Sequence, residues 1–249
     1  MDMKSRTEAM RALSLYTANE LDLSKGALSE EDKNKAKENL DILTPIVKAW
    51  CTDQGVLIAS TGVQVHGGMG FIEETGAAQH YRDARILPIY EGTNGIQALD
   101  LLRRKLTMDD GNVFRRFLNE MKKDAEDCIL IEKGELSYIG NKVLNAINIL
   151  EETADELLSM WKLNKRQAAS GATPFIDMCG SIFGGWMMAK SALKASQLLK
   201  NDDKNKFLIS KISTSSFYVD TVLESSLSLK NVVTTAHKNV GAILYNTKN

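Results

Sequence analysis

Residues 81–106 read YRDARILPIYEGTNGIQALDLLRRKL, a stretch that combines helix signals with a clear interruption. From residue 93 onward the apolar side chains recur at three- and four-residue spacings, which predicts a helix over 93–105. Pro88 lacks a backbone N–H and excludes a continuous helix through the segment before it. Glu91 therefore lies on a bend just ahead of a predicted helix N-terminus.

Two interpretations of Glu91 follow from this position. A carboxylate is stabilised by the positive end of a helix dipole, and Thr93 is a good N-cap, so Glu91 can be no more than a charge at the start of a helix. That interpretation does not explain why Tyr90, Glu91 and Gly92 follow Pro88 on a non-helical bend. A carboxylate held on such a bend among apolar residues is suited to act as a general base. The residues alone leave both interpretations open.

Outward from this stretch, the chain carries helical periodicity almost throughout and shows almost no β-hairpin signals. It contains only three prolines, so few positions interrupt a helix. The sequence therefore predicts an all-α protein. Residues 62–76 are rich in glycine and are expected to form an irregular loop. The expected helices cover residues 2–23, 30–60, 77–84, 93–105, 112–131, 136–165, 174–200, 204–228 and 230–244.

Residues 107–112, TMDDGN, have the composition of a linker and divide the chain into two expected units. We predict one helical domain over residues 1–106 and a second helical bundle over residues 107–249. In the second unit, Gly180 and Gly184 are four residues apart on one face of a predicted helix. Such a pair allows close approach of a neighbouring element, so it indicates packing rather than chemistry.

Composition and charge exclude several classes of function. The chain has 249 residues with 31 basic and 32 acidic side chains, and no basic patch that would suit nucleic acid. No apolar run is long enough to span a membrane, and the charged N-terminal segment does not fit a signal peptide. The three cysteines are scattered as in a reducing compartment, and the three histidines show no paired spacing. We therefore expect a cytoplasmic protein without a metal site.

A second group of glycines, in QVHGGMGF at residues 64–71, needs its own explanation. It is not a dinucleotide-binding fingerprint, because no strand pattern precedes it and Glu73 stands where a third glycine is required. It is not a phosphate-binding P-loop either, since no Gly-Lys-Ser/Thr follows. Two interpretations remain. The segment is a tight turn between helices, or its backbone is closely approached by a ligand, with the amide of Gln64 able to donate and accept hydrogen bonds.

The two motifs occur together in a known family. QVHGGMGF and YRDARILPIYEGTNGIQALDLLRRKL, in this order, resemble the C-terminal helical domain of the acyl-CoA dehydrogenases. The first residues, MDMKSRTEAMRALSLYTA, resemble an internal helix of that domain. Residues 107–245 resemble an extra helical domain appended in a bacterial subgroup that includes the methylmercaptopropionyl-CoA dehydrogenases; their most recognisable part is TPFIDMCGSIFGGWMMAKSALKA. The resemblance covers nearly the whole chain.

The resemblance implies an FAD-dependent enzyme that oxidises an acyl-CoA thioester to the trans-2-enoyl-CoA. In the family, a glutamate of the YEGT motif removes the α-proton while hydride leaves the β-carbon for FAD, and Glu91 matches that glutamate. The backbone N–H of the same glutamate is a donor to the thioester carbonyl, so Glu91 would act both as base and as donor. Tyr90 and Gly92 would lie against the substrate, and Gly92 would let the acyl chain and flavin come close.

Contacts with FAD are implied by the same resemblance. The positions that match the family's FAD-contacting residues are Gln64, Gly67, Gly68, Thr93, Asn94 and Gly95. The first three match a motif that meets the ADP part of an FAD bound mainly by a neighbouring subunit. The last three match a segment at a helix N-terminus that suits a pyrophosphate. Gly95 stands where better-known members have glutamine, so only a backbone contact is expected there.

The family's N-terminal helical domain, middle β-domain and Arg-x-x-Phe-Gly flavin motif have no counterpart in this sequence. We therefore expect the chain to start within a domain, as a cloned piece, a truncated gene product or one half of a split enzyme, and to bind FAD weakly or not at all alone. Expected partners are an acyl-CoA substrate, further copies of the chain in a dimer or tetramer, a separate chain with the missing domains, and electron-transfer flavoprotein as acceptor. The alternative is a non-catalytic helical oligomerisation module or an inactive remnant.

Overall fold

Helices form the fold throughout the part of the chain that the structure describes. This computed structural model describes residues 1–131, 134–235 and 238, and no β-strand occurs among them. The prediction of an all-α protein is therefore confirmed. The expected continuation of the last helix over residues 236–237 and 239–244 lies outside the described residues.

The elements follow one another with short connections. The first part of the chain forms α1 (Asp2–Gly26), α2 (Glu30–Val65), α3 (Gly68–Phe71), the 3₁₀ turn η1 (Glu73–Thr75), α4 (Ala77–Ile86), α5 (Asn94–Asp100) and the π-helical turn η2 (Leu101–Lys105). The second part forms η3 (Met108–Gly111), α6 (Asn112–Ile129), α7 (Glu135–Leu163), α8 (Lys165–Ser170), α9 (Ala172–Leu199), α10 (Lys206–Tyr218), the π-helical turn η4 (Val219–Leu223), α11 (Glu224–Ser226) and α12 (Leu229–Thr235).

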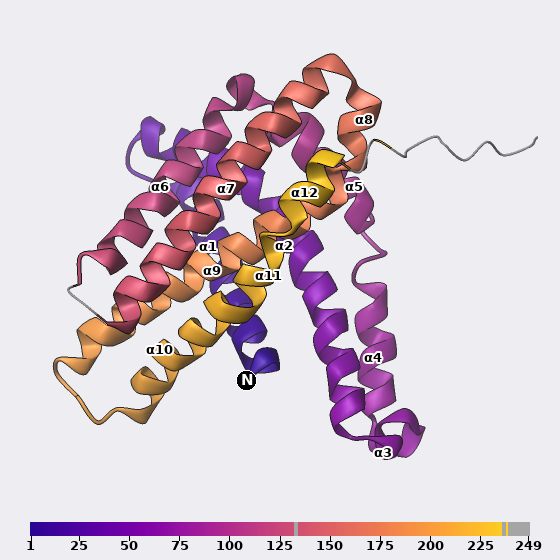
Figure 1. The fold of residues 1–249 in the computed structure, drawn as a ribbon, viewed down its shortest axis with the longest axis vertical. Coiled ribbons are helices and arrows are strands. Elements are labelled where there is room, and N and C mark those ends of the chain that lie inside the picture. Colours follow the sequence, from indigo (N-terminus) through magenta and orange to yellow (C-terminus); the bar gives the residue numbers. More distant parts are fainter. Residues whose placement is uncertain (132–133, 236–237, 239–249) are drawn as a thin grey trace, which may run out of the picture.

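Helix α9 lies at the centre of the molecule and joins its two parts. It packs against α1 and α2 from the first part and against α6, α7 and α10 from the second (Figure 1). Its middle is buried on all sides, which explains why its sequence is apolar all round rather than amphipathic. The buried residues form one continuous core from Ala9 in α1 to Val233 in α12. The two predicted units therefore share a core, and the boundary near residue 107 stays a prediction.

Gly180 and Gly184 mark close packing, but the group that approaches them is a side chain. The indole of Trp50 in α2 lies directly over both glycines, and a Cβ atom on Gly180 would overlap it. The indole N–H of Trp50 donates a hydrogen bond to Ser181 Oγ at 3.2 Å. The hydroxyl of Tyr218 donates to the backbone oxygen of Ser181 at 2.9 Å. The Trp50 contacts hold α2 against α9, the Tyr218 bond holds α10 there, and α2 in turn carries one side of the candidate site.

The prediction of a loop over residues 62–76 was wrong at its start. Helix α2 continues to Val65, and α3 and η1 occupy much of the remaining stretch. Glycine weakens a helix by only about 1 kcal/mol, and packing of α2 against α4 offsets that cost. The second half of α2 and α4 form a projecting pair with α3 at its tip, which we call the arm (residues 55–86; Figure 1).

Candidate functional site

The Glu91 loop (residues 87–93) connects α4 to α5 beside the root of the arm. Helix α4 ends at Ile86, because the proline at position 88 cannot donate a helical hydrogen bond. Pro88 is buried, and its carbonyl accepts a hydrogen bond from the backbone N–H of Asn94 at 3.1 Å. This bond joins the two ends of the loop, so the residues between them form a closed turn.

Glu91 and Gly92 adopt left-handed backbone conformations at the tip of this loop. The φ angles are +53° at Glu91 and +84° at Gly92. A residue with a side chain pays about 1–2 kcal/mol to adopt this conformation, so the surrounding structure must impose it. At Gly92 the positive φ favours glycine, and a Cβ atom there would lie 3.1 Å from Nε2 of Gln97, so the end of that side chain would have to shift. The Tyr90–Gly92 bend predicted from the sequence is present.

Asn94 fastens the loop to α2 through its side chain. Its amide nitrogen donates to the backbone oxygen of Ala49 and to Thr52 Oγ1, both at 3.0 Å. Its amide oxygen accepts from Lys48 Nζ at 2.8 Å. We call Lys48, Thr52 and Asn94 the Asn94 anchor. The side chain of Asn94 is fully engaged with α2, so any contact of this residue with a cofactor would involve its backbone.

The sequence did not reveal the α2 side of this anchor. Lys48 and Thr52 are four residues apart and therefore lie on the same face of α2. Asp53 follows them, and partial burial raises the pKa of its carboxyl, while Asn94 and the charge of Lys48 act in the opposite direction. No local signal distinguishes these polar residues from an ordinary solvated helix face, because their role depends on the packing of α5 against α2.

Several backbone N–H groups of the Glu91 loop and of the start of α5 have no hydrogen-bond partner. In the described part of the chain, the N–H groups of residues 91, 92, 93 and 95 make no hydrogen bond. Thr93 is the N-cap of α5, as predicted, and accepts from the N–H of Ile96 at 3.4 Å. Glu91 is exposed, and the apolar side chains of Ile89 and Tyr90 beside it are each 47% exposed. The loop thus presents a carboxylate, several free donors and apolar surface together.

The other predicted cofactor residues lie at the tip of the arm. Gln64, Gly67 and Gly68 are all exposed, and Gly67 has a φ of +61°. A Cβ atom on Gly67 or Gly68 would meet no atom within 4 Å, so the backbone there is open to an approaching ligand. Gly70 has a different role, because a Cβ at that position would overlap the backbone oxygen of Val63. The backbone of Gly67 and Gly68 is therefore accessible to a ligand, whereas Gly70 is required by the packing of the turn.

The structure does not bring the two groups of predicted cofactor residues together. Asn94 is bound to Thr52, and Gln64 lies twelve residues further along the same helix, which places the groups about 18 Å apart. Figure 1 shows α3 and the start of α5 at opposite ends of the arm. A compact ligand therefore cannot contact both groups of a single chain.

Other kinds of site are absent from the described residues. No group of three or more His, Cys, Asp and Glu side chains there could hold a metal ion. Burial raises the pKa of the Cys51 and Cys128 thiols to about 11, so both are protonated and unreactive near neutral pH. Across the same part of the chain, every helix is too short or too polar to cross a membrane.

Two family profiles match the chain and together cover most of it. The profile described as "Acyl-CoA dehydrogenase, C-terminal domain" matches residues 1–106. The profile described as "Acetyl-CoA dehydrogenase C-terminal like" matches residues 117–243. Both the Glu91 loop and the arm fall within the first match.

Curated relatives show the same similarity at the level of whole sequences. A 3-methylmercaptopropionyl-CoA dehydrogenase of Ruegeria pomeroyi is 41% identical over 228 residues, which cover 89% of this chain and 37% of the relative. A butyryl-CoA dehydrogenase of Syntrophomonas wolfei is 30% identical over 232 residues, covering 88% of this chain and 36% of the relative. The chain thus spans little more than a third of the length of these proteins.

Solved structures share the fold. The crystal structure of Caenorhabditis elegans ACDH-11 in complex with C11-CoA has a TM-score of 0.72 at 22% identity, covering 93% of this chain and 38% of that one. An acyl-CoA dehydrogenase from Bacillus anthracis, complexed with FAD, has a TM-score of 0.68 at 18% identity, covering 98% of this chain and 42% of that one. At these identities the comparison supports the fold alone.

Proposed function

Because this chain belongs to the acyl-CoA dehydrogenase family, we propose that it forms the part of an FAD-dependent acyl-CoA dehydrogenase that carries the catalytic base, Glu91. The observation that supports this role is the geometry of the Glu91 loop. Holding a non-glycine residue at φ +53° on a closed loop costs free energy, and the N–H of Glu91 is left free. A carboxylate that only interacted with the helix dipole would need neither feature.

The proposed chemistry uses two groups of Glu91, its carboxylate and its backbone N–H. The α-hydrogen of an acyl-CoA thioester is weakly acidic, so a carboxylate must be aimed at it and the developing enolate must be stabilised. The Glu91 carboxylate would take the α-proton, and the Glu91 N–H would donate to the thioester oxygen. Ile89 and Tyr90 would cover the acyl part and exclude water. Bound FAD would supply the acceptor for the hydride that leaves the β-carbon.

The cofactor contacts would come from two copies of the chain. The free backbone donors near Thr93 and Gly95 suit a phosphate group close to Glu91. Gln64, Gly67 and Gly68, about 18 Å away along α2, would reach the ADP part of an FAD bound mainly by another subunit. This division agrees with a dimer or tetramer. Electron-transfer flavoprotein would reoxidise the flavin, and acyl-CoA would be the substrate.

The role of Glu91 is tested by measuring acyl-CoA-dependent reduction of an artificial electron acceptor in the presence of FAD. The chain is assayed alone and together with a separate chain that carries the family's N-terminal helical and middle β-domains. We expect turnover in the combined sample, and we expect Glu91→Gln to lower kcat by roughly 10²- to 10⁴-fold, the usual contribution of a general base. The remote exposed carboxylate of Glu126 in α6 supplies a matched control, Glu126→Gln.

The alternative function, a non-catalytic oligomerisation module, predicts a different result. It predicts no turnover in the combined sample even when the proteins form a stable complex that contains FAD. Equal activity of Glu91→Gln and the unchanged protein would refute the assignment of the base while leaving family membership intact.

A further inference from the structure

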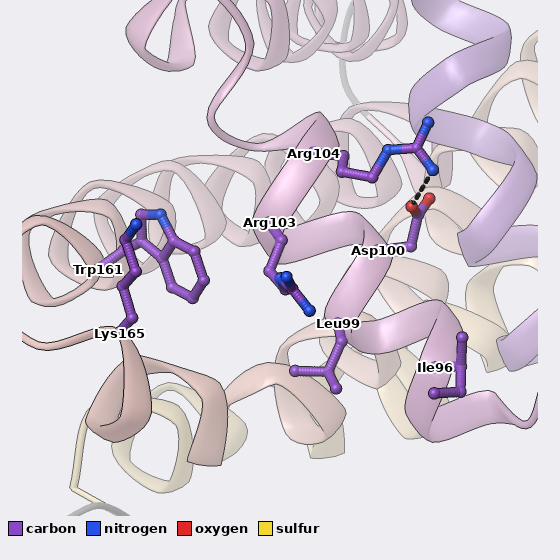
Figure 2. A pocket seen from close by; sticks show the side chains of 7 residues that line it. All are labelled: Ile96, Leu99, Asp100, Arg103, Arg104, Trp161 and Lys165. Atoms are coloured by element: carbon purple, nitrogen blue, oxygen red, sulfur yellow. Dashed lines mark hydrogen bonds and ion pairs between the residues drawn. The ribbon is translucent and has the colours of Figure 1, made fainter.

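A cavity of about 460 Å³ opens between α5–η2 and the junction of α7 with α8 (Figure 2). Ile96, Leu99 and Arg103 form one wall, and their spacing places them on one face of α5 and η2. Trp161 and Lys165 form the opposite wall. We call this cavity the Trp161 pocket. It includes neither Glu91 nor the residues matched to FAD contacts, so its role is independent of the proposed function.

Two positive charges in the Trp161 pocket have no acidic partner among the described residues. Arg104 is engaged with Asp100 at 3.0 Å, whereas neither Arg103 nor Lys165 forms an ion pair there. Figure 2 shows Arg103 beside Leu99, on the side of the helix that faces Trp161, while Arg104 reaches toward Asp100. The ammonium group of Lys165 lies 5.6 Å from the centre of the Trp161 ring. The pocket is therefore positively charged and retains unused hydrogen-bond donors.

The backbone of η2 adds a second observation at the same place. The N–H of Leu106 donates to the oxygen of Leu101 at 2.8 Å, a π-helical bond that closes a wider turn than an α-helix does. Such turns are rare and are found frequently at functional sites. This one carries Arg103 into the wall of the pocket.

We propose that the Trp161 pocket binds a nucleoside monophosphate, with the phosphate between Arg103 and Lys165 and the nucleoside against Trp161 and Leu99. A guanidinium and an ammonium group together match the oxygens of a phosphate. The indole and the aliphatic side chains provide a surface for a base or sugar, which an inorganic anion would leave unused. The volume falls in the range of small-ligand pockets and suits a molecule of this size.

The test is a binding titration of the 249-residue chain with AMP, adenosine and inorganic phosphate. Tryptophan fluorescence is a suitable signal, because Trp50 and Trp186 are each only 1% exposed and Trp161 is the tryptophan that a ligand can reach. Calorimetry measures the same affinities without relying on the indole. We expect AMP to bind, phosphate to compete with it and adenosine to bind at least about tenfold more weakly, because it lacks the charged group.

Single substitutions test whether AMP binds in the Trp161 pocket. Arg103→Gln and Lys165→Gln should each weaken AMP binding about tenfold, the usual effect of losing one charge-assisted hydrogen bond. Lys162→Gln removes the same charge nearby, at an exposed lysine that is paired with Asp110 outside the pocket, and should leave the affinity unchanged. Circular dichroism confirms that each variant is folded. The proposal is overturned if AMP fails to bind at millimolar concentration or adenosine binds equally well. It is also overturned if Lys162→Gln weakens binding as much as the two pocket variants.

Discussion

At the scale of single residues, Asn94 determines where Glu91 lies. Its backbone N–H closes the Glu91 loop on Pro88, and its side chain bonds to Lys48, Ala49 and Thr52 of α2. The side chain of Glu91, which has a left-handed backbone conformation, makes no hydrogen bond or ion pair with another described residue. The strain at Glu91 is therefore offset by bonds made three residues further along the chain.

Replacing Asn94 by Ala should loosen the loop and destabilise the protein. The substitution removes the side-chain bonds and leaves the Lys48 ammonium without its partner, while the Ala49 carbonyl keeps the bond from Thr52 Oγ1, at a cost of about 1–3 kcal/mol. The midpoint of thermal unfolding should fall by roughly 2–4 °C for each kcal/mol. Hydrogen exchange of the bonded amides of residues 89, 90 and 94 should become faster by a larger factor than exchange in α7, which follows only the lower global stability.

Two comparisons make this test specific. Asn94→Asp retains the acceptor for Lys48 but loses both donated bonds, so its effect on exchange should lie between those of the native residue and alanine. Asn148→Ala removes an exposed asparagine from α7 and should leave the loop unaffected. If exchange at residues 89, 90 and 94 of Asn94→Ala rose no more than exchange in α7, the anchor would not position Glu91.

The bend that carries Glu91 could be predicted from the sequence, but its anchor could not. The bend at Pro88 and the N-cap at Thr93 depend on neighbours in the chain, and such local effects are visible in the sequence. Lys48 and Thr52 are separated from Asn94 by 46 and 42 residues, respectively. Their pairing depends on the way α5 packs against α2, which no periodicity of either segment specifies.

At the scale of the elements, packing against neighbours overrides local propensity. The glycines of residues 62–76 indicated a loop, yet α2 runs through Gly62 to Val65 because α4 packs along it. Conversely, Gly180 and Gly184 lie inside α9, where glycine is unfavourable, because other side chains occupy the space that a Cβ would need: Trp50 at Gly180, and both Tyr218 and Trp50 at Gly184. Glycine is therefore tolerated in α2 despite its low helix propensity, whereas in α9 it is required by the packing.

Alanine substitution should separate these two kinds of helical glycine by the sign of the stability change. At Gly180 a Cβ atom would overlap the Trp50 side chain, so Gly180→Ala should destabilise the protein by about 1–3 kcal/mol through overpacking. At Gly55 in α2 no atom lies within 4 Å, so Gly55→Ala should stabilise the protein by roughly 0.5–1 kcal/mol. Equilibrium unfolding in urea measures both changes in the free energy of unfolding. If Gly180→Ala proved as stabilising as Gly55→Ala, the described packing of α9 on Trp50 would be incorrect.

At the scale of the whole molecule, one core joins both halves while the arm lies outside it. The core runs from α1 to α12 through α9, so the residues before and after 107 are expected to unfold together. The arm instead exposes large apolar side chains at its tip: Phe71 is 82% exposed, Val65 is 74% exposed and Met69 is 57% exposed. Clustered apolar side chains of this kind mark interaction surfaces.

A second copy of the chain is the partner that we expect on the arm, because the proposed function needs the arm tip to reach an FAD held by another subunit. Phe71→Glu should weaken self-association by more than about tenfold, since a buried aromatic contact would be replaced by a charge. The stability of the monomer should hardly change, because the side chain is 82% exposed.

Sedimentation velocity over a range of concentrations measures both the size of the assembly and the association equilibrium. Leu163→Glu changes an 88% exposed leucine at the end of α7 and should leave association unaltered. A native chain that is monomeric at every concentration, or equal dissociation by both variants, would show that the arm is not a subunit interface.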